Sequence, residues 1–376
     1  MKQPKVLIVG ASISGLASAA CLKKQGIEYT IIEKHSHVAS PWRNHYQRLH
    51  LHTNKRVSSL PYKKFGSGIP RYPGRQQVVD YLEDYTNEFN ILPLFNTEAK
   101  SIKKLNDHWV TETNTENFQS KYVIIATGAF GKPKPMHFKG IESFTGKILH
   151  SADYKTGKAF EGQKVLVVGF GNSACEIAID LYEQGAVPFM SVRSPVNIIP
   201  RDVLGIPILE ISQWMSKLPP RMADIVNAPL LRILIGDITK LGLKKMPYGP
   251  FEQIHRDASV PVLDIGTVKH IRQRHIKVLG DISHIENRIV YFTGGEKQEV
   301  DAIVAGIGYY RGYADILEVD PSRFEDLKAP VAKQKYFGHD GLYFCGFYIS
   351  PTGQIKEIGN DAKEIAKNIA KREKLK

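Results

Sequence analysis

The sequence is poor in cysteine and lacks any paired thiol motif. Its 376 residues include only 3 cysteines, Cys21, Cys175 and Cys345, which lie far apart and form no C-x-x-C pair. A disulfide scaffold is therefore implausible, and the local dithiol of a typical disulfide reductase is absent. Each cysteine lies within an apolar helix or strand pattern, which predicts buried and inert thiols.

Long hydrophobic runs are missing as well. No apolar segment approaches the roughly 18 residues that suggest a membrane span, and the longest candidate, residues 228–238, is interrupted by Arg232. The N-terminus enters a predicted strand directly, without the charged leader, apolar segment and cleavage site of a signal peptide. These features predict a cytoplasmic protein with no membrane segment.

Acidic residues are fewer than basic ones, 38 against 51, which gives a formal charge of +13. Such an excess would suit nucleic acid, an anionic surface or acidic small molecules. Much of it comes from scattered lysines and the tail at residues 367–376. Since no aromatic-interleaved basic motif accompanies it, nucleic acid is not an expected partner. The length suits two globular domains, each with its own core.

A glycine-rich strand-turn-helix opens the chain. The apolar run Val6–Val9 predicts a buried parallel strand, and the glycine pattern that follows matches G-x-G-x-x-G except that Ser12 replaces the second glycine. A dinucleotide pyrophosphate would lie at the helix N-terminus, held by free amides and the helix dipole. The candidate residues of this turn are Gly10, Ser12, Ile13, Ser14 and Gly15.

The strand after this helix ends in Glu33 and Lys34, 23 and 24 residues after Gly10. A carboxylate at this place can accept hydrogen bonds from both ribose hydroxyls of an unphosphorylated adenosine. Strand, turn, helix, second strand and terminal glutamate together predict a site for FAD.

A second unit of the same kind spans residues 163–194. Gly169, Gly171, Asn172, Ser173 and Ala174 form its turn, in the G-x-G-x-x-A version of the motif. Arg193, followed by Ser194, takes the place that Glu33 has in the first unit. A guanidinium binds a 2′-phosphate that a carboxylate would repel, so this unit predicts an NADPH site. A solvated surface arginine is the alternative for Arg193.

Two apolar strands run into small-residue turns, at Ala126, Thr127 and Gly128 and at residues 305–308, where we expect the chain to pass between domains. A last strand, residues 341–347, precedes a periodic helix that begins near Gln354 and could direct its positive end toward a flavin. The predicted fold is α/β, with two doubly wound Rossmann-like dinucleotide-binding domains, one nested within the other. The FAD domain would comprise residues 1–145 and 300–376, and the NADPH domain 146–299.

Between the two glycine motifs, Phe144, Gly146, His150 and Tyr154 match F-x-G-x-x-x-H-x-x-x-Y at every specified position. Here the sequence resembles the flavin-containing monooxygenases, in their YUCCA-like branch. The resemblance also covers residues 46–62, 72–85, 192–205 and 260–282, and extends over nearly the whole chain. Related Baeyer–Villiger enzymes end a longer signature with tryptophan rather than tyrosine, which argues against that branch.

The resemblance implies that NADPH reduces FAD, that reduced flavin captures O2 as a C4a-hydroperoxide, and that one oxygen atom passes to a small organic substrate. The substrate would be a soft nitrogen or sulfur nucleophile, or an α-keto acid. In the family an asparagine lies beside the flavin C4a, and Asn54 matches it, although YUCCA sequences often carry proline there. A turn asparagine is the alternative. Trp42 and Arg48 match the family's flavin-covering segment.

Several histidines and one long insertion allow more than one interpretation. His150 would be either a hydrogen-bonded linker residue, which we favour, or a general base. His50 and His52 alternate with leucines, which predicts that both imidazoles face one side of a strand, but no further ligand pattern supports a metal site. Residues 200–265 predict a mostly helical insertion that acts as a lid or serves domain packing.

Two rival functions remain open. A pyridine nucleotide-driven flavin oxidase or reductase would release peroxide, and a non-catalytic redox sensor would bind both nucleotides without turnover. Fold alone does not separate these from a monooxygenase. A homodimer is a possible assembly.

Overall fold

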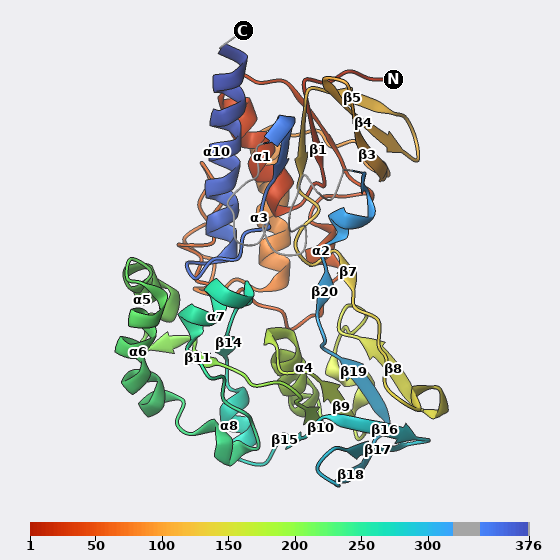
Figure 1. The fold of residues 1–376 in the computed structure, drawn as a ribbon, viewed down its shortest axis with the longest axis vertical. Helices are drawn as coiled ribbons and strands as arrows, with labels where there is room; N and C mark the ends of the chain where they lie inside the picture. The colour runs from red at the N-terminus through yellow and green to blue at the C-terminus, as the bar shows by residue number, and fades with distance from the viewer. Residues whose placement is uncertain (319–338, 375–376) are drawn as a thin grey trace. The chain divides into compact units, whose positions relative to one another are not determined.

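The computed structural model describes residues 1–318 and 339–374, which belong to two compact units (Figure 1). Unit 1 comprises Met1–Asn44, Thr53–Lys132 and the chain from Tyr310 on. Unit 2 comprises His45–His52 and Pro133–Tyr309. Unit 2 is therefore nested within unit 1 along the sequence.

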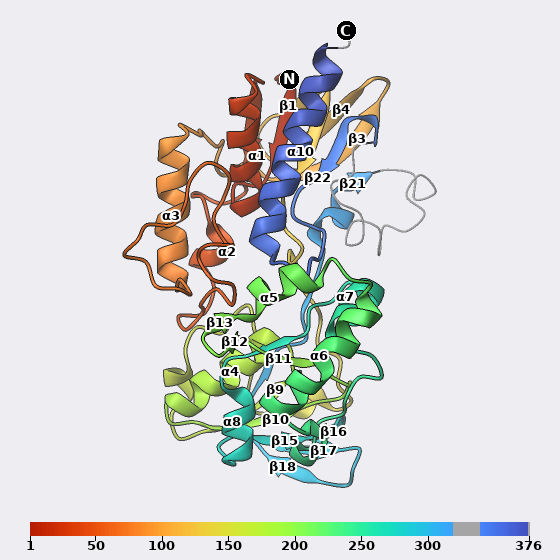
Figure 2. The same ribbon diagram turned by 90° about the vertical axis from the view of Figure 1, so that its left-hand side faces the viewer.

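The main sheet of unit 1 has four parallel strands in the order β2-β1-β6-β22. They are β1 (Val6–Val9), β2 (Tyr29–Ile32), β6 (Tyr122–Ile125) and β22 (Leu342–Phe344). Residues of β1, β6 and β22 are buried throughout, as expected for a parallel sheet covered on both faces. Helices α1 (Ile13–Lys24) and α10 (Gln354–Lys374) lie side by side, as Figures 1 and 2 both show.

Unit 1 also contains a smaller sheet in the order β21-β3-β4-β5. Its strands are β3 (Ala99–Leu105), β4 (His108–Thr113), β5 (Phe118–Ser120) and β21 (Leu317–Glu318). Trp109, Phe118 and Ile102 pack with β1 and β22 residues in one core. Unit 1 also contains helices α2 (Ser40–Arg43) and α3 (Arg75–Glu88) and the 3-10 turns η4 (Gly312–Asp315) and η6 (His339–Gly341).

Unit 2 is built on a five-stranded parallel sheet in the order β15-β10-β9-β19-β8. The strands are β8 (Lys147–His150), β9 (Lys164–Val168), β10 (Val187–Ser191), β15 (Lys277–Leu279) and β19 (Ala302–Ala305). Helices α4 (Asn172–Glu183) and α8 (Thr267–Arg272) pack together beside it. An antiparallel meander, β16 (Ile282–Glu286), β17 (Ile289–Phe292) and β18 (Lys297–Glu299), follows β15.

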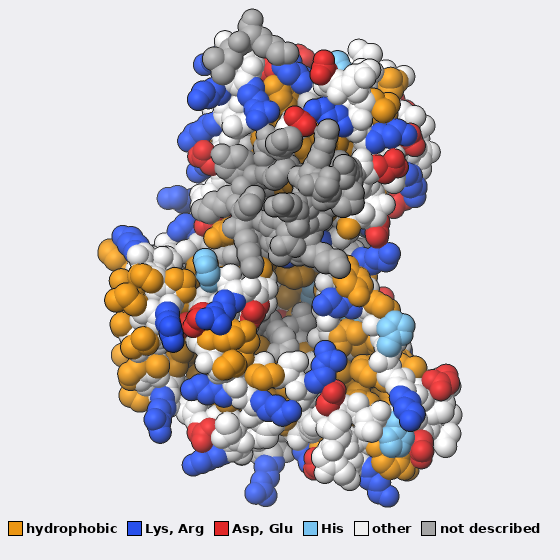
Figure 3. Space-filling view, viewed as in Figure 1, with side chains coloured by type: hydrophobic (Ala, Val, Ile, Leu, Met, Phe, Trp, Pro, Cys, Tyr) orange, Lys and Arg blue, Asp and Glu red, His pale blue; other side chains and the backbone are white. Residues whose placement is uncertain are grey.

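Between β10 and α8 lies the insertion that the sequence predicted as mostly helical. It contains α5 (Ile208–Met215), α6 (Pro220–Leu234) and α7 (Pro250–Asp257), with the short strands β11 (Ile198–Pro200), β12 (Asp202–Val203), β13 (Ile206–Pro207) and β14 (Val262–Asp264). Its inner residues form a small core around Ile208. Its outer face carries exposed Trp214, Ile225 and Ile233, and Figure 3 shows hydrophobic side chains gathered over α5 and α6.

The domain boundaries differ from those predicted. We placed residues 300–376 and 1–145 together, but β19 pairs with β9 and β8 and so lies inside the unit 2 sheet. The chain changes unit at 132/133 and 309/310 instead. Residues 45–52 also belong to unit 2, because their side chains bind α4. Within the described residues, no helix is long and apolar enough to cross a membrane.

Candidate functional site

The first glycine turn connects β1 to α1 in unit 1. Gly10 has φ +107°, and a Cβ there would lie 2.8 Å from the carbonyl oxygen of Ala126. A Cβ at Gly15 would overlap the carbonyl oxygen of Gly10. Both glycines are therefore required by the close approach of α1 and β6 to this turn, whatever ligand it binds.

The start of α1 presents backbone amides rather than side chains. Ser12 is the N-cap residue but makes no side-chain cap bond within the described chain, and Ser14 is buried, with its hydroxyl close to Gly346. Ile13 is buried too. Amides in the first helical turn have no intrahelical partner, so they fit a pyrophosphate.

Glu33 lies directly beside this turn. Its Oε2 accepts from the amide of Ala11 at 2.8 Å, and its Oε1 accepts from the amide of His35 at 3.0 Å. The side chain is 7% exposed, so these two bonds hold the carboxylate at the end of β2. Each oxygen keeps one acceptor position for a ribose hydroxyl. Lys34 is exposed.

The crossover after β6 contains an unsatisfied buried group. Thr127 Oγ1 is buried and has no hydrogen-bond partner in residues 1–318 and 339–374. Gly128 has φ +85°, and a Cβ there would meet no described atom within 4 Å. Buried polar groups are normally hydrogen-bonded, so the Thr127 hydroxyl makes this crossover a candidate for nucleotide binding, and the open space lies at Gly128.

The second glycine turn, in unit 2, connects β9 to α4. Gly169 has φ +110°, and a Cβ there would lie 2.6 Å from the carbonyl oxygen of Gly306. Gly171 differs, since its φ of −84° is open to any residue and a Cβ would meet no described atom within 4 Å. Neither strain nor protein packing explains glycine at 171, whereas the close approach of a phosphate does.

The side chains after Gly171 are engaged with the protein. Asn172 Oδ1 accepts from the amide of Leu263 at 2.8 Å, the Ser173 side chain interacts with that of Tyr46, and Ala174 packs closely on Gly306. The amides of this turn are therefore the groups that fit a pyrophosphate. Beyond β10, Arg193 and Ser194 are exposed. The position of Arg193 suits both a 2′-phosphate contact and the solvated alternative.

Asn54 is 2% exposed and forms a turn. Its Oδ1 accepts from the amides of Arg56 at 2.9 Å and Val57 at 3.2 Å. The amide oxygen thus has the local role that the turn alternative expected. The hydrogen bond that the sequence predicted near the flavin would therefore be donated by the amide nitrogen, Nδ2.

The F-x-G-x-x-x-H-x-x-x-Y signature is structural within unit 2. Phe144 is part of the core, and a Cβ at Gly146 would overlap the carbonyl oxygen of Asp301. His150 Nδ1 accepts from the amide of Ala152, and Nε2 then donates to the carbonyl of Gly308, both at 3.1 Å. Burial lowers the pKa of His150. Both ring nitrogens are engaged, which supports the linker interpretation over a general base.

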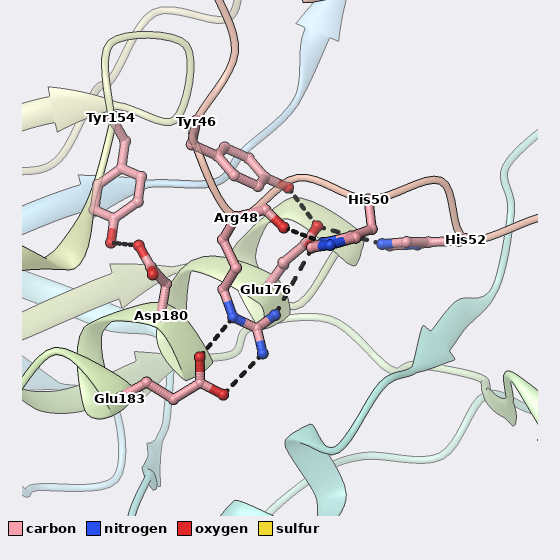
Figure 4. A network of polar contacts seen from close by, with 8 residues as sticks. All are labelled: Tyr46, Arg48, His50, His52, Tyr154, Glu176, Asp180 and Glu183. Carbon is pink, nitrogen blue, oxygen red and sulfur yellow. Dashed lines mark hydrogen bonds and ion pairs between the residues drawn. The ribbon is translucent and has the colours of Figure 1, made fainter. Parts of the chain in front are cut away.

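Arg48, which the sequence matched to a flavin-covering segment, binds an acidic side chain of unit 2. It belongs to unit 2, and its guanidinium donates to both carboxylate oxygens of Glu183 on α4, at 2.8 and 2.9 Å (Figure 4). The sequence did not indicate this ion pair, because the partner lies 135 residues away and no local pattern links the two residues. Trp42 remains in unit 1, half-buried on α2.

The expected strand at residues 49–52 is also absent. His50 forms only a single β-bridge, His52 lies in a bend, and the two leucines have no regular structure, so His50 and His52 do not share a strand face. His50 Nδ1 lies 2.5 Å from the carbonyl oxygen of Arg48, while His52 Nε2 lies 3.3 Å from Glu176. In the described part of the chain, no group of three or more His, Cys, Asp or Glu side chains is placed to hold a metal.

All three cysteines are buried, as the sequence predicted. Burial raises the pKa of the Cys21 thiol to about 11, and it also raises the pKa values of the Cys175 and Cys345 thiols. The sequence analysis missed Glu176, Asp180 and Glu183, although their spacing of four and three residues in a helical segment was a readable signal.

The chain is similar to known proteins over nearly its whole length. Residues 7–201 match the family described as pyridine nucleotide-disulphide oxidoreductase. The chain is 36% identical to the Arabidopsis thaliana protein "Indole-3-pyruvate monooxygenase YUCCA6" over 377 residues, covering 97% of this chain and 90% of the relative. It is 34% identical to "Indole-3-pyruvate monooxygenase YUCCA1" of Oryza sativa over 373 residues, covering 97% and 91%.

The fold is likewise shared with solved structures. A flavin-containing monooxygenase from Stenotrophomonas maltophilia superposes with a TM-score of 0.73 at 19% identity, covering 99% of both chains. This likeness confirms the predicted α/β fold with two Rossmann-like dinucleotide-binding domains.

Proposed function

Because the chain belongs to the flavin-containing monooxygenase family, in its YUCCA-like branch, we propose that it uses FAD and NADPH to transfer one oxygen atom from O2 to a small α-keto acid. That the chain is a flavin-dependent monooxygenase follows from the family. The two cofactors, their sites and the substrate class are the content of the proposal.

One observation carries the assignment of cofactors. The two units share the same glycine turn, but the strand after the helix ends in the buried carboxylate Glu33 in unit 1 and leads to the exposed guanidinium Arg193 in unit 2. A carboxylate accepts from ribose hydroxyls, and a guanidinium binds a 2′-phosphate. Unit 1 would therefore hold FAD and unit 2 NADPH.

When it is bound, FAD would supply the activation of dioxygen for oxygen transfer. The protein would contribute the two pyrophosphate turns and the buried loop around Asn54, from which Nδ2 would donate a hydrogen bond to the reacting oxygen.

The α-keto acid is favoured over a soft nitrogen or sulfur compound by the names of the relatives, which are indole-3-pyruvate monooxygenases. For an α-keto acid, R-CO-COOH, O2, NADPH and H⁺ would give R-COOH, CO2, H2O and NADP⁺. One oxygen atom enters the new carboxylic acid while the carbon–carbon bond to the original carboxyl breaks. The other oxygen atom leaves as water.

The test is oxygen uptake with a substrate panel, combined with measurement of CO2 and peroxide. Indole-3-pyruvate and phenylpyruvate would represent the keto acids, trimethylamine the soft nitrogen compounds, and a methyl aryl sulfide the soft sulfur compounds. We expect NADPH, O2 and CO2 in a 1:1:1 ratio with a keto acid. Coupled uptake only with the amine or sulfide would contradict the substrate class.

Two further results would contradict oxygen transfer itself. Peroxide equal to the NADPH consumed, whatever the substrate, would identify an oxidase. Flavin that is neither reduced nor reoxidised in the presence of NADPH and O2 would identify a sensor.

A further inference from the structure

Helix α4 carries three acidic side chains along one side, Glu176, Asp180 and Glu183. Their spacing of four and three residues places them in successive turns of one helix face. Glu176 is only 1% exposed and Asp180 only 5%. Buried carboxylates are costly unless they are paired and hydrogen-bonded, so their partners identify what this face is built to hold.

Most of these partners come from the short segment His45–His52. Tyr46 donates its hydroxyl to Glu176 Oε2 at 2.7 Å, and His52 Nε2 lies 3.3 Å from the same oxygen. Arg48 pairs with two of the carboxylates: it binds Glu183 through two hydrogen bonds, and its Nη1 lies 3.8 Å from Glu176 Oε1 (Figure 4). Three side chains of one segment thus converge on α4.

The middle carboxylate ties the signature tyrosine to the same helix. Asp180 Oδ2 accepts from the Tyr154 hydroxyl at 2.6 Å and from the amide of Gly157 at 2.8 Å. The rings of Tyr46 and Tyr154 meet edge to face, with centroids 6.2 Å apart. Burial is the main cause that raises the pKa of both tyrosines, and the neighbouring carboxylate raises it further, so both hydroxyls remain donors at neutral pH.

The network lies on α4 close to the glycine turn that is proposed to bind the nucleotide. α4 begins directly after Gly171, and Glu176 follows five residues later, about 7.5 Å along the helix. Uncompensated carboxylates there would weaken an anion site at the helix N-terminus, and Arg48 supplies the compensating charge. Ser173 of the turn also interacts with the Tyr46 side chain, so the network extends to the motif itself.

We propose that Glu176 is a positioning residue that anchors the segment His45–His52 to α4 through Tyr46, Arg48 and His52. The anchored segment runs directly into the loop that carries Asn54, since Asn54 follows His52 by only two residues along the chain. The anchor itself is a property of unit 2, while its effect on catalysis rests on the proposed function.

The first test measures the anchor without turnover. Hydrogen exchange of the FAD-loaded full-length protein would be compared among the parent, Glu176→Gln and Arg48→Met. Amides of residues 45–52 should exchange about tenfold faster in both variants, the usual effect of losing one charge-assisted contact. Glu299→Gln is the matched control, because Glu299 forms an exposed ion pair with Lys164 in the same unit. It should leave residues 45–52 unchanged.

The second test separates positioning from general stability. Glu176→Gln should raise the KM for NADPH and the peroxide released per NADPH about three- to tenfold, which corresponds to the loss of one charge-assisted contact. Flavin content should stay equal to that of the parent. Arg48→Lys keeps the charge without the paired geometry and should fall between the parent and Arg48→Met. If Glu176→Gln does not fold, Tyr46→Phe, which removes only one hydrogen bond, takes its place.

Two results would overturn the anchor. The first is unchanged exchange of residues 45–52 in Glu176→Gln. The second is loss of flavin from Arg48→Met with normal exchange of the segment, which would return Arg48 to the FAD site that the sequence suggested. Faster exchange in a protein that fails to oxygenate any substrate would leave the anchor standing and reject the proposed function alone.

Discussion

The two nucleotide units solve the same geometric problem at their first glycine. Gly10 and Gly169 both have positive φ, +107° and +110°, and each faces a carbonyl oxygen of the crossover strand, from Ala126 in unit 1 and Gly306 in unit 2. A side chain would collide with backbone in both units. The first glycine is therefore a requirement of the fold and says nothing about which nucleotide is bound.

The units differ at the later positions of the motif. In unit 1, Gly15 must be glycine because a Cβ would overlap the carbonyl of Gly10. In unit 2, Ala174 takes that place, and its methyl group fits because the facing residue, Gly306, has no side chain. Only Gly171 is a glycine without a protein reason. In such motifs, the glycine that indicates a bound ligand is therefore the one that protein packing does not require.

The largest expected effect is a different response of the two glycine turns to a bulky side chain. Gly10→Val would force Cβ against the carbonyl of Ala126 at a φ that valine avoids, so we expect a colourless or unstable protein. Gly171→Val meets no described atom and should give a stable yellow protein. Its anaerobic reduction by NADPH should be at least about a hundredfold slower at low nucleotide, since bulk would exclude the pyrophosphate.

Flavin absorbance, thermal unfolding and anaerobic reduction would check both variants. Gly68→Val is the control in unit 1, because Gly68 is exposed and a Cβ there meets nothing within 4 Å. A yellow Gly10→Val protein with normal flavin content, or a colourless Gly171→Val protein, would contradict the assignment of the two turns.

The next largest effect concerns the charged residue that follows the second strand of each unit, Glu33 in unit 1 and Arg193 in unit 2. Arg193→Ala should raise the KM for NADPH about tenfold or more, because a charge-assisted contact to phosphate contributes roughly 1.5–3 kcal/mol. The KM for NADH should change little. Steady-state kinetics with both nucleotides would measure this, with Arg274→Ala as an exposed control in unit 2. Equal changes for NADPH and NADH would support the solvated alternative.

A smaller effect tests what Asn54 contributes. Asn54→Asp keeps the oxygen that caps the amides of Arg56 and Val57 but removes the Nδ2 donor, whereas Asn54→Leu removes both. If the Nδ2 donor assists oxygen transfer, both variants should release a few times more peroxide per NADPH. The reason is that the loss of a buried hydrogen-bond partner costs about 1–3 kcal/mol. Peroxide and product yields would be measured together. An Asp variant as well coupled as the parent would leave Asn54 with its turn role only.

Much of this organisation was readable from the sequence because it is local. The apolar runs, the glycine turns and their charged ends lie within about thirty residues of one another, and they predicted both nucleotide folds correctly. The strand Ala302–Ala305 was assigned to the wrong domain because an apolar run into a small-residue turn fits either sheet. Only its pairing with β9 and β8 decides between them.

Long-range polar contacts were beyond local reasoning. Arg48 resembled a flavin contact by its place in a segment, but its carboxylate partners lie on α4, more than a hundred residues later. His52 was predicted on a strand face and instead meets Glu176 from a bend. Such contacts depend on which surfaces the fold brings together, and spacing within one segment does not encode that.

The smallest expected effect is a pH response of the unit 2 crossover, where His150 bonds Gly308, the counterpart of Gly128 in unit 1. Burial lowers the pKa of His150 below its ordinary 6.5, opposed by the Gly308 carbonyl and Asp153. Between the two pKa values the unfolded chain binds a proton that the native protein does not. The free energy of unfolding should therefore fall as pH drops below about 6.5, by at most about 1.4 kcal/mol per pH unit.

His150→Gln can keep one donor and one acceptor but does not titrate, so it should flatten this slope while leaving stability near pH 8 within about 1 kcal/mol of the parent. Denaturant unfolding between pH 5 and 8 would measure it, with exposed His137→Gln as the control in the same unit. A slope that persists in His150→Gln would place the titrating group elsewhere. A slope that vanishes together with NADPH-dependent reduction would return His150 to the catalytic role that its two satisfied nitrogens argue against.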